Sequence, residues 1–191
     1  MIELLWITSV IIALGVVLLY NSLIVKKNRV ENAFASIDVM LKKRYDLIPN
    51  LVETVKGYAS HERAVLEEVT ELRRQAISGN KSTEERIVMD NSLSDALLRL
   101  IVTVESYPDL KASDHFMHLQ RSLNEVEEQL SASRRAYNAA VTAYNTAIEI
   151  FPNSVLARTV GFKHRTLLAT PQGERVVPRV DTSPEEAGPK A

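Results

Sequence analysis

Residues 114–151 read DHFMHLQRSLNEVEEQLSASRRAYNAAVTAYNTAIEIF, and this stretch decides the fold class. Its apolar residues recur every three or four positions, a spacing that places them on one face of an α-helix. The steps come close to a heptad seam, and Pro152 ends the pattern. The stretch predicts one long helix, whose apolar face holds Phe116, Leu119, Leu123, Val126, Leu130, Tyr137, Tyr144, Ile148 and Phe151.

The chain before this helix shows the same periodicity. A first helix is predicted to reach Tyr45, because apolar residues share one face and no glycine or proline separates Tyr20 from Tyr45. We expect the chain to turn at residues 46–50, where Asp46 can cap a second helix and Pro49 fits its first turn. That second helix is expected to end near residues 78–80. The first apolar face holds Val30, Phe34, Ile37 and Leu41.

Two further signals mark the remaining helices. Ser82 and Glu85 have the spacing of a capping box, which predicts a third helix that stops before Tyr107. Ser113 or Asp114 can cap the last helix. Because short connections between helices imply antiparallel neighbours, the sequence predicts an all-α fold with an antiparallel bundle of four long helices.

The N-terminal stretch predicts a transmembrane helix that continues into this bundle. Residues 4–25 carry no charge, and about 20 apolar residues span a bilayer core of roughly 30 Å. Trp6 and Tyr20 lie near the two ends, where aromatic rings favour the membrane interface. A cleaved signal peptide is the alternative, but it needs a basic leader, and only Glu3 precedes this run. Residues 1–25 are therefore predicted to form the anchor.

The flanking charges predict the orientation. Lys26, Lys27 and Arg29 form the first polar cluster after the anchor, so the positive-inside rule places the following domain in the cytoplasm. These basic groups would also contact anionic membrane lipid. We expect a single-pass protein of the bacterial cytoplasmic (inner) membrane, with a helical domain over residues 26–168. Proline, glycine and charge then replace the periodicity, which predicts a disordered tail over residues 169–191.

Composition and motifs argue against catalysis. A net charge of -1 does not suit a nucleic-acid partner, and zero cysteines exclude thiolate chemistry. His61-Glu62 begins like a zinc-protease motif, but Val65 stands where the second histidine belongs. His115 and His118 lie one turn apart without an evident third metal ligand. We expect a non-enzymatic protein with no catalytic residues, no metal site and no cofactor.

Three polar features have two interpretations. Tyr137-Asn138 and Tyr144-Asn145 repeat seven residues apart, which aligns the two asparagines along one edge of the seam. Asp38 stands at the edge of the first helix's apolar face, and the segment from Tyr45 and Asp46 to Pro49 and Asn50 packs acid, proline and amide together. These groups form either a hydrogen-bond network that fixes helix register or a docking surface.

The same stretches closely resemble the LemA family of bacterial single-span membrane proteins. The resemblance covers residues 20–168 and rests on the segments 20–30, 37–52, 57–62 and 107–112, the paired Tyr-Asn motifs, Phe151-Pro152 and Gly161-Phe162. An aromatic-acidic ending is expected after Gly161-Phe162, but residues 163–168 read KHRTLL. The resemblance implies an antiparallel helical bundle with no established enzymatic activity. One relative is associated with magnetosome membranes, which hints at membrane organisation.

Three functions compete at this point. The first is a homo-oligomeric scaffold that self-assembles at the membrane and organises or remodels it, with the heptad seam of the last helix pairing between copies as a coiled coil. Lys42-Lys43-Arg44 would then face a neighbour or a partner. The second is a monomeric adaptor for a signalling or membrane-protease partner. The third, an enzyme with a metal inside the bundle, requires inward-facing glutamates and histidines.

Overall fold

The computed structural model describes residues 1–59, 61–78 and 83–168, and every regular element within them is a helix. The predicted tail over residues 169–191 and the Ser82 half of the predicted capping box lie outside the described residues. The all-α prediction is confirmed. In chain order the helices are α1 (Ile2–Tyr58), α2 (Arg63–Ile77), α3 (Thr83–Val104), α4 (Pro108–Lys111), α5 (Asp114–Glu149) and α6 (Asn153–Val160).

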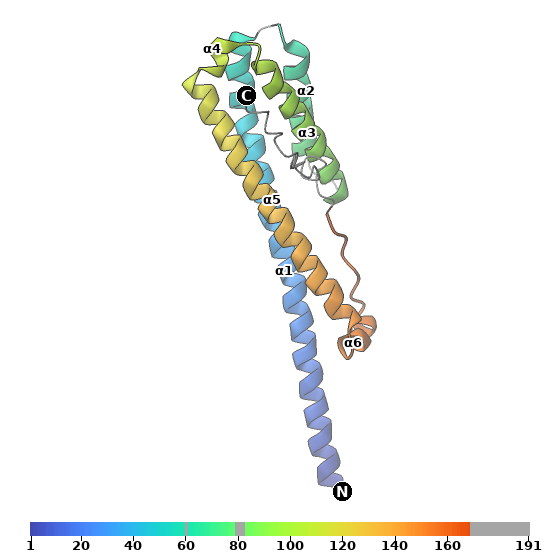
Figure 1. Cartoon of the computed structure of the whole chain (residues 1–191). Coiled ribbons are helices and arrows are strands. Elements are labelled where there is room, and N and C mark those ends of the chain that lie inside the picture. Colours follow the sequence, from blue (N-terminus) through green and yellow to red (C-terminus); the bar gives the residue numbers. More distant parts are fainter. Residues whose placement is uncertain (60, 79–82, 169–191) are drawn as a thin grey trace, which may run out of the picture.

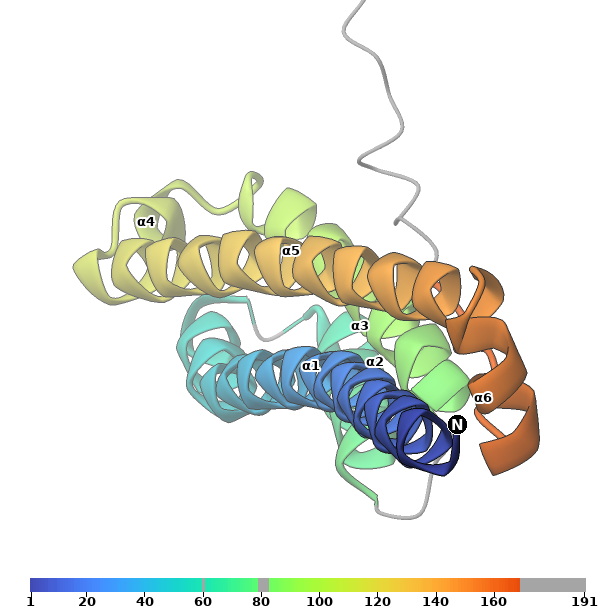
Figure 2. The ribbon, with the colours of Figure 1, turned by 90° about the horizontal axis from the view of Figure 1, so that it is seen from below.

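The two longest helices, α1 and α5, pack lengthwise and form the spine of the molecule (Figure 1). The α2–α3 hairpin covers the upper half of this pair, so that α1, α2, α3 and α5 form an antiparallel four-helix arrangement there. Below the hairpin, α6 packs against α1 and α5 near the lower end of α5 (Figures 1 and 2). The four helices are unequal, since α1 has 57 residues and α2 has 15.

The prediction of a turn at residues 46–50 is wrong, because α1 runs through Pro49 to Tyr58. Asp46 lies inside this helix, far from its ends, and therefore does not cap a helix; its side chain is exposed. Proline lacks the N–H that would bond to the carbonyl four residues earlier, which is that of Tyr45. Arg73 of α2 replaces this donor, since its Nε lies 2.7 Å from the Tyr45 carbonyl oxygen. A bond from another helix thus lets α1 continue to Tyr58, and α2 begins at Arg63.

Replacing Arg73 with methionine is expected to lower the free energy of unfolding by about 1–3 kcal/mol, because the carbonyl of Tyr45 loses its donor. In a Pro49→Ala background the cost should be smaller, since alanine restores the N–H of residue 49. Urea unfolding of the four proteins in a double-mutant cycle measures this coupling. Arg74→Met is the matched control, because Arg74 is exposed and pairs with Glu71 on the surface. Equal costs in both backgrounds would contradict the assignment.

The apolar face of α5 is buried inside the same chain. Leu123, Leu130, Val141 and Tyr144 are at most 8% exposed and belong to one core with residues of α1. The seam that was expected to pair between copies therefore packs mainly along α1 of its own chain. The burial of each large apolar side chain contributes roughly 1.5–3 kcal/mol, so α5 and α1 hold each other in register.

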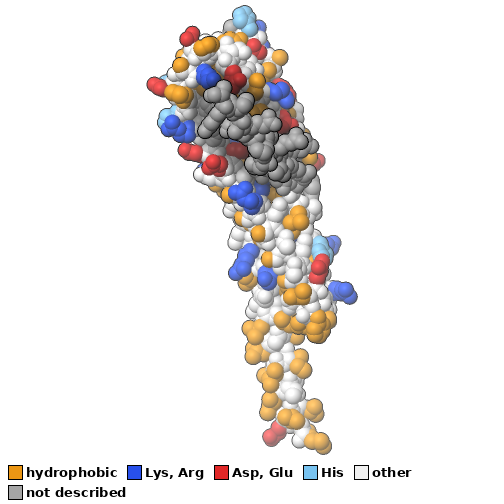
Figure 3. Space-filling view, in the orientation of Figure 1, with side chains coloured by type: hydrophobic (Ala, Val, Ile, Leu, Met, Phe, Trp, Pro, Cys, Tyr) orange, Lys and Arg blue, Asp and Glu red, His pale blue; other side chains and the backbone are white. Residues whose placement is uncertain are grey.

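The first part of α1 projects below the bundle (Figure 1), and hydrophobic side chains line the face of it that Figure 3 shows. Residues 4–25 of this helix carry no charge. Residues 1–14 are all exposed, and they include Leu4, Trp6 and Ile11. The helix is long and apolar enough to cross a membrane, with none of its most apolar window buried inside the protein. A helix that is apolar all round needs a surrounding of lipid or protein. These residues form a candidate membrane span.

Candidate interaction surface

The two asparagines of the Tyr-Asn repeats bind the main chain of residues 163–168, which follow α6 as an extended segment without regular secondary structure. Asn145 Nδ2 donates to the carbonyl of Arg165 at 2.9 Å, and the Arg165 N–H donates to Asn145 Oδ1 at 3.0 Å. The side-chain amide thus makes both bonds that a neighbouring β-strand residue would make. Each asparagine can hold one residue of an extended chain.

Asn138 repeats this arrangement one heptad earlier. Its Nδ2 donates to the Leu168 carbonyl at 3.0 Å, and the Leu168 N–H donates to its Oδ1 at 2.8 Å. Seven residues of helix rise about 10.5 Å, and three residues of extended chain advance about 10 Å. The asparagine spacing on α5 therefore matches the spacing of residues 165 and 168, with the segment antiparallel to the helix.

The two tyrosines of the repeats donate hydrogen bonds to two other main-chain carbonyls of the same segment. Tyr144 Oη donates to the carbonyl of Lys163 at 3.0 Å, and Tyr137 Oη donates to that of Thr166 at 3.3 Å. Both rings are buried, and burial raises the pKa of Tyr144, so its hydroxyl keeps the proton that it donates. We call Tyr137, Asn138, Tyr144 and Asn145 the Tyr-Asn ladder.

Apolar side chains anchor the segment at its two ends. The ring of Phe162 lies 6.5 Å from that of Tyr144, centroid to centroid, and 6.4 Å from that of Tyr20 on α1. Leu168 is 8% exposed and lines a small recess with apolar residues of α1, among them Phe34 and Leu41. The side chains of residues 163–167 are exposed. The surface therefore recognises an extended chain by its backbone and by apolar residues six positions apart.

The other predicted polar residues are only partly brought to this surface. Asp38 pairs with Arg86 of α3 at 2.9 Å, and both line the recess that holds Leu168. Tyr45 is buried, and burial raises the pKa of its hydroxyl. The expectation that residues 45–50 form one polar turn is wrong, because they lie inside α1, where Tyr45 is buried while Asp46 and Asn50, four positions apart, share an exposed face.

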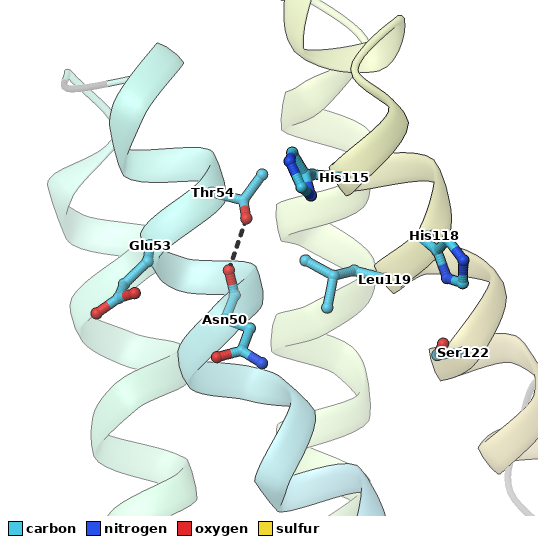
Figure 4. A pocket seen from close by; sticks show the side chains of 7 residues that line it. All are labelled: Asn50, Glu53, Thr54, His115, His118, Leu119 and Ser122. Atoms are coloured by element: carbon cyan, nitrogen blue, oxygen red, sulfur yellow. Dashed lines mark hydrogen bonds between the residues drawn. The ribbon is translucent and has the colours of Figure 1, made fainter.

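Asn50 instead lines an open recess between α1 and α5 at the far end of the bundle (Figure 4). His115 and His118 of α5 lie on the opposite wall (Figure 4). Within residues 1–59, 61–78 and 83–168 there is no group of three histidine, aspartate or glutamate residues that could hold a metal ion. The recess therefore offers a polar surface and no metal-binding geometry.

A buried ionic cluster ties together α1, α3 and α5, and sequence reasoning missed it. Asp90 of α3 accepts hydrogen bonds from Arg44 of α1, at 3.1 Å, and from Arg134 of α5. Arg44 also lies 3.2 Å from Glu127. The Asp90 side chain is 1% exposed, so burial raises the pKa of its carboxyl while the two guanidinium groups oppose that rise. We call Arg44, Asp90 and Arg134 the ionic cluster.

The cluster corrects one expectation. Lys42 and Lys43 are exposed, but Arg44 is 5% exposed and points into the bundle instead of facing a neighbour or a partner. The sequence did hold a signal for this, since Arg44 follows Leu41 by three positions and therefore shares the apolar face of its helix. Arg134 follows Leu130 by four positions in the same way.

The predicted membrane-interface residues lie along the lower part of α1. Trp6 and Tyr20 are exposed, Lys26 and Lys27 are partly exposed, and Arg29 is exposed. Lys27 pairs with Glu31 at 3.8 Å, and Arg165 of the extended segment pairs with the same carboxylate at 3.5 Å. The lower bundle therefore presents basic groups beside the apolar helix. Their contact with lipid stays a prediction.

An apolar N-terminal helix that continues into an all-α domain fits a class of membrane-associated helical proteins. Within this class the chain belongs to the LemA family, whose sequence profile matches residues 33–181. The membrane association predicted from the sequence fits this family.

Three relatives illustrate the similarity. The chain is 25% identical to the magnetosome protein MamQ of Magnetospirillum gryphiswaldense over 169 residues, which cover 75% of this chain and 62% of the relative. It is 26% identical to magnetosome protein MamQ 2 of Paramagnetospirillum magneticum, with the same coverage. The LemA protein of Metamycoplasma hominis is 24% identical over 85% of this chain and 74% of its own length. The chain thus spans less than two thirds of the magnetosome relatives.

Proposed function

We propose that the protein is a non-enzymatic scaffold that self-assembles at the bacterial inner membrane, with its bundle in the cytoplasm. The observation that carries this proposal is the binding of residues 163–168 to the Tyr-Asn ladder. Asn138 and Asn145 donate two hydrogen bonds to main-chain carbonyls and accept two from main-chain N–H groups. Because the ladder binds main-chain atoms, the same segment of a second copy offers it the same hydrogen-bonding groups.

The local geometry favours such an exchange. Gly161 ends α6 with a φ of 84°, a left-handed conformation that glycine adopts without strain, and the chain reverses direction there. A change at this one residue redirects the segment away from its own α5. Exchange of an identical segment between copies is a low-cost route to association, because each bond lost in one copy is regained in the other.

The membrane anchor also supports association, because it holds all copies in one plane and in one orientation. Helix α1 is continuous from the apolar span into the bundle core, so each copy holds its ladder at the same height above the bilayer and in the same orientation. Confinement of oriented copies to one plane raises their effective concentration. The orientation itself follows from Lys26, Lys27 and Arg29 by the positive-inside rule. The magnetosome names of the MamQ relatives support a role in organising membrane.

Cysteine pairing tests the exchange, since the chain has no native cysteine. Thr142 lies on α5 between the two ladder asparagines, and Thr166 lies in the segment that crosses them. We expect membranes that contain a mixture of Thr142→Cys and Thr166→Cys proteins to yield a disulfide-linked dimer on mild oxidation. A mixture of Thr142→Cys and Val102→Cys proteins is the control, because Val102 is also exposed but lies on α3.

The opposite outcome would be equally clear. If the Thr142→Cys/Thr166→Cys double variant forms its disulfide within one chain while the mixture forms none, the segment stays on its own copy. The proposal of self-assembly through the ladder would then fail. The protein would more closely fit the second function, a monomeric adaptor whose ladder receives an extended segment of a signalling or membrane-protease partner. Co-purification of such a partner with the monomer would support that alternative.

A further inference from the structure

We propose that α6 and the turn before it form a second membrane contact, an interfacial helix that lies on the anionic lipid surface beside the anchor. The inference rests on the membrane anchoring and is independent of self-assembly. It starts from large apolar side chains that the bundle leaves exposed at this end. Phe151 is 82% exposed, Val155 61%, Ile150 52% and Val160 49%.

These side chains gather where the bundle meets the apolar part of α1. Helix α6 packs against α1, and Phe162 directly after it lies 6.4 Å from Tyr20, centroid to centroid. In Figure 3, hydrophobic side chains at the lower end of the bundle continue onto the projecting helix. In Figure 2, which views the molecule from the side of the N-terminus, α6 lies next to α1.

The length of the anchor places this level at the lipid boundary. A bilayer core of about 30 Å takes roughly 20 residues of helix, so a span that begins near residue 4 leaves the core near residues 20–25. Leu23 belongs to the uncharged run but is 0% exposed, because the bundle already covers α1 at this position. The rest of the bundle therefore contacts α1 at the height of the membrane interface. An exposed apolar patch there meets lipid and not water.

Basic groups outnumber acidic ones around α6, where the exposed Glu149 before the turn lies 3.5 Å from His164. Arg158 is the one charged residue within Asn153–Val160, and Lys163 comes three residues after the end of the helix. Lys26 and Lys27 lie on the neighbouring part of α1. Apolar side chains on one side with basic groups around them are the pattern of helices that lie in the headgroup region.

Other occupants fit the patch less well. A second copy would have to cover it at a height where lipid headgroups already surround the anchor.

A second membrane contact has a mechanical consequence, since one span alone lets the bundle tilt and rotate about α1. Two membrane contacts fix the rotation of the bundle about α1, and therefore fix which side of the bundle faces a neighbouring copy in the membrane.

A fluorescent probe at Val155 tests this contact. Full-length Val155→Cys protein, labelled with an environment-sensitive fluorophore, is reconstituted in vesicles of phosphatidylcholine and phosphatidylglycerol that carry nitroxide-labelled lipid. Val102→Cys is the matched control, because Val102 is 59% exposed and lies on α3 in the upper bundle. We expect loss of most of the fluorescence at residue 155 and of almost none at residue 102. Arg158→Glu should reduce the loss at residue 155.

The possible contrary results are distinct. Equal quenching at the two positions would overturn the second contact while leaving the anchor intact. A blue-shifted probe at residue 155 that nitroxide lipid does not quench would mean that protein covers the patch, which also overturns it. Failure of the protein to float with the vesicles would overturn both the anchor and the second contact. Circular dichroism of the labelled proteins verifies that the bundle is folded in each case.

Discussion

Replacing Asp90 with alanine is expected to lower the free energy of unfolding by about 3–5 kcal/mol, because it leaves the guanidinium groups of Arg44 and Arg134 buried without their shared carboxylate. Both arginines are less than 10% exposed, so water cannot take the place of the lost partner. Urea or thermal unfolding of the full-length protein in detergent, followed by circular dichroism, measures the loss. Asp95→Ala on the same helix is the control, because Asp95 is exposed.

The cause of this loss can be separated from simple truncation. A triple variant in which Arg44 and Arg134 become methionine and Asp90 becomes leucine removes all three charges together. Such apolar replacements of buried ion clusters are often neutral or stabilising. We expect the triple variant to recover most of the stability lost in Asp90→Ala. If the triple variant is as unstable as Asp90→Ala, uncompensated buried charge is not the cause.

The second large effect is expected from the Tyr-Asn ladder. The double variant Asn138→Ala/Asn145→Ala removes four hydrogen bonds to residues 165 and 168, each worth about 0.5–1.5 kcal/mol. The segment should then leave α5, with its detachment favoured by a factor of roughly 30 to 20,000 at 1.4 kcal/mol per tenfold change. Trypsin should cleave after Lys163 and Arg165 much faster in this variant, since proteases need a detached, extended backbone.

The Asn138→Ala/Asn145→Ala variant should keep its fold, whereas Asp90→Ala in the ionic cluster destabilises the whole bundle. The asparagines lie on the exposed edge of α5, whereas its buried face packs on α1. Cleavage sites in other helices should therefore keep their rates. Thr146→Ala is a matched control, because Thr146 is exposed on α5 next to Asn145. Unchanged cleavage after Lys163 and Arg165 in the double variant would mean that the ladder does not hold the segment.

Helical periodicity predicted most of this fold, because it depends on local spacing. The long α5, the third helix and the continuous path from the anchor into the bundle all follow from apolar residues that share a face. The division of α1 at Pro49 was predicted wrongly. Proline's missing hydrogen bond is a local signal, but its replacement by Arg73 comes from a residue 28 positions from Tyr45. Such compensation is visible only once α2 has a place beside α1.

The candidate site could be predicted only in part, for the same reason. The seven-residue repeat of Tyr137-Asn138 and Tyr144-Asn145 was evident, and both a register network and a docking surface were left open. The segment that these residues bind lacks helical periodicity, so no pattern in residues 163–168 indicated where it lies. Arg44, Asp90 and Arg134 are similarly separated in sequence, and their pairing depends on the packing of three helices.

The mass of the detergent-solubilised full-length protein, measured by light scattering, tests self-assembly through the ladder most directly when wild type and Asn138→Ala/Asn145→Ala are compared. We predict that the wild-type protein elutes as an assembly of two or more copies and that the double variant, folded by circular dichroism, elutes as a monomer. A wild-type monomer, or an assembly of equal mass in both proteins, would contradict a scaffold built by exchange of residues 163–168.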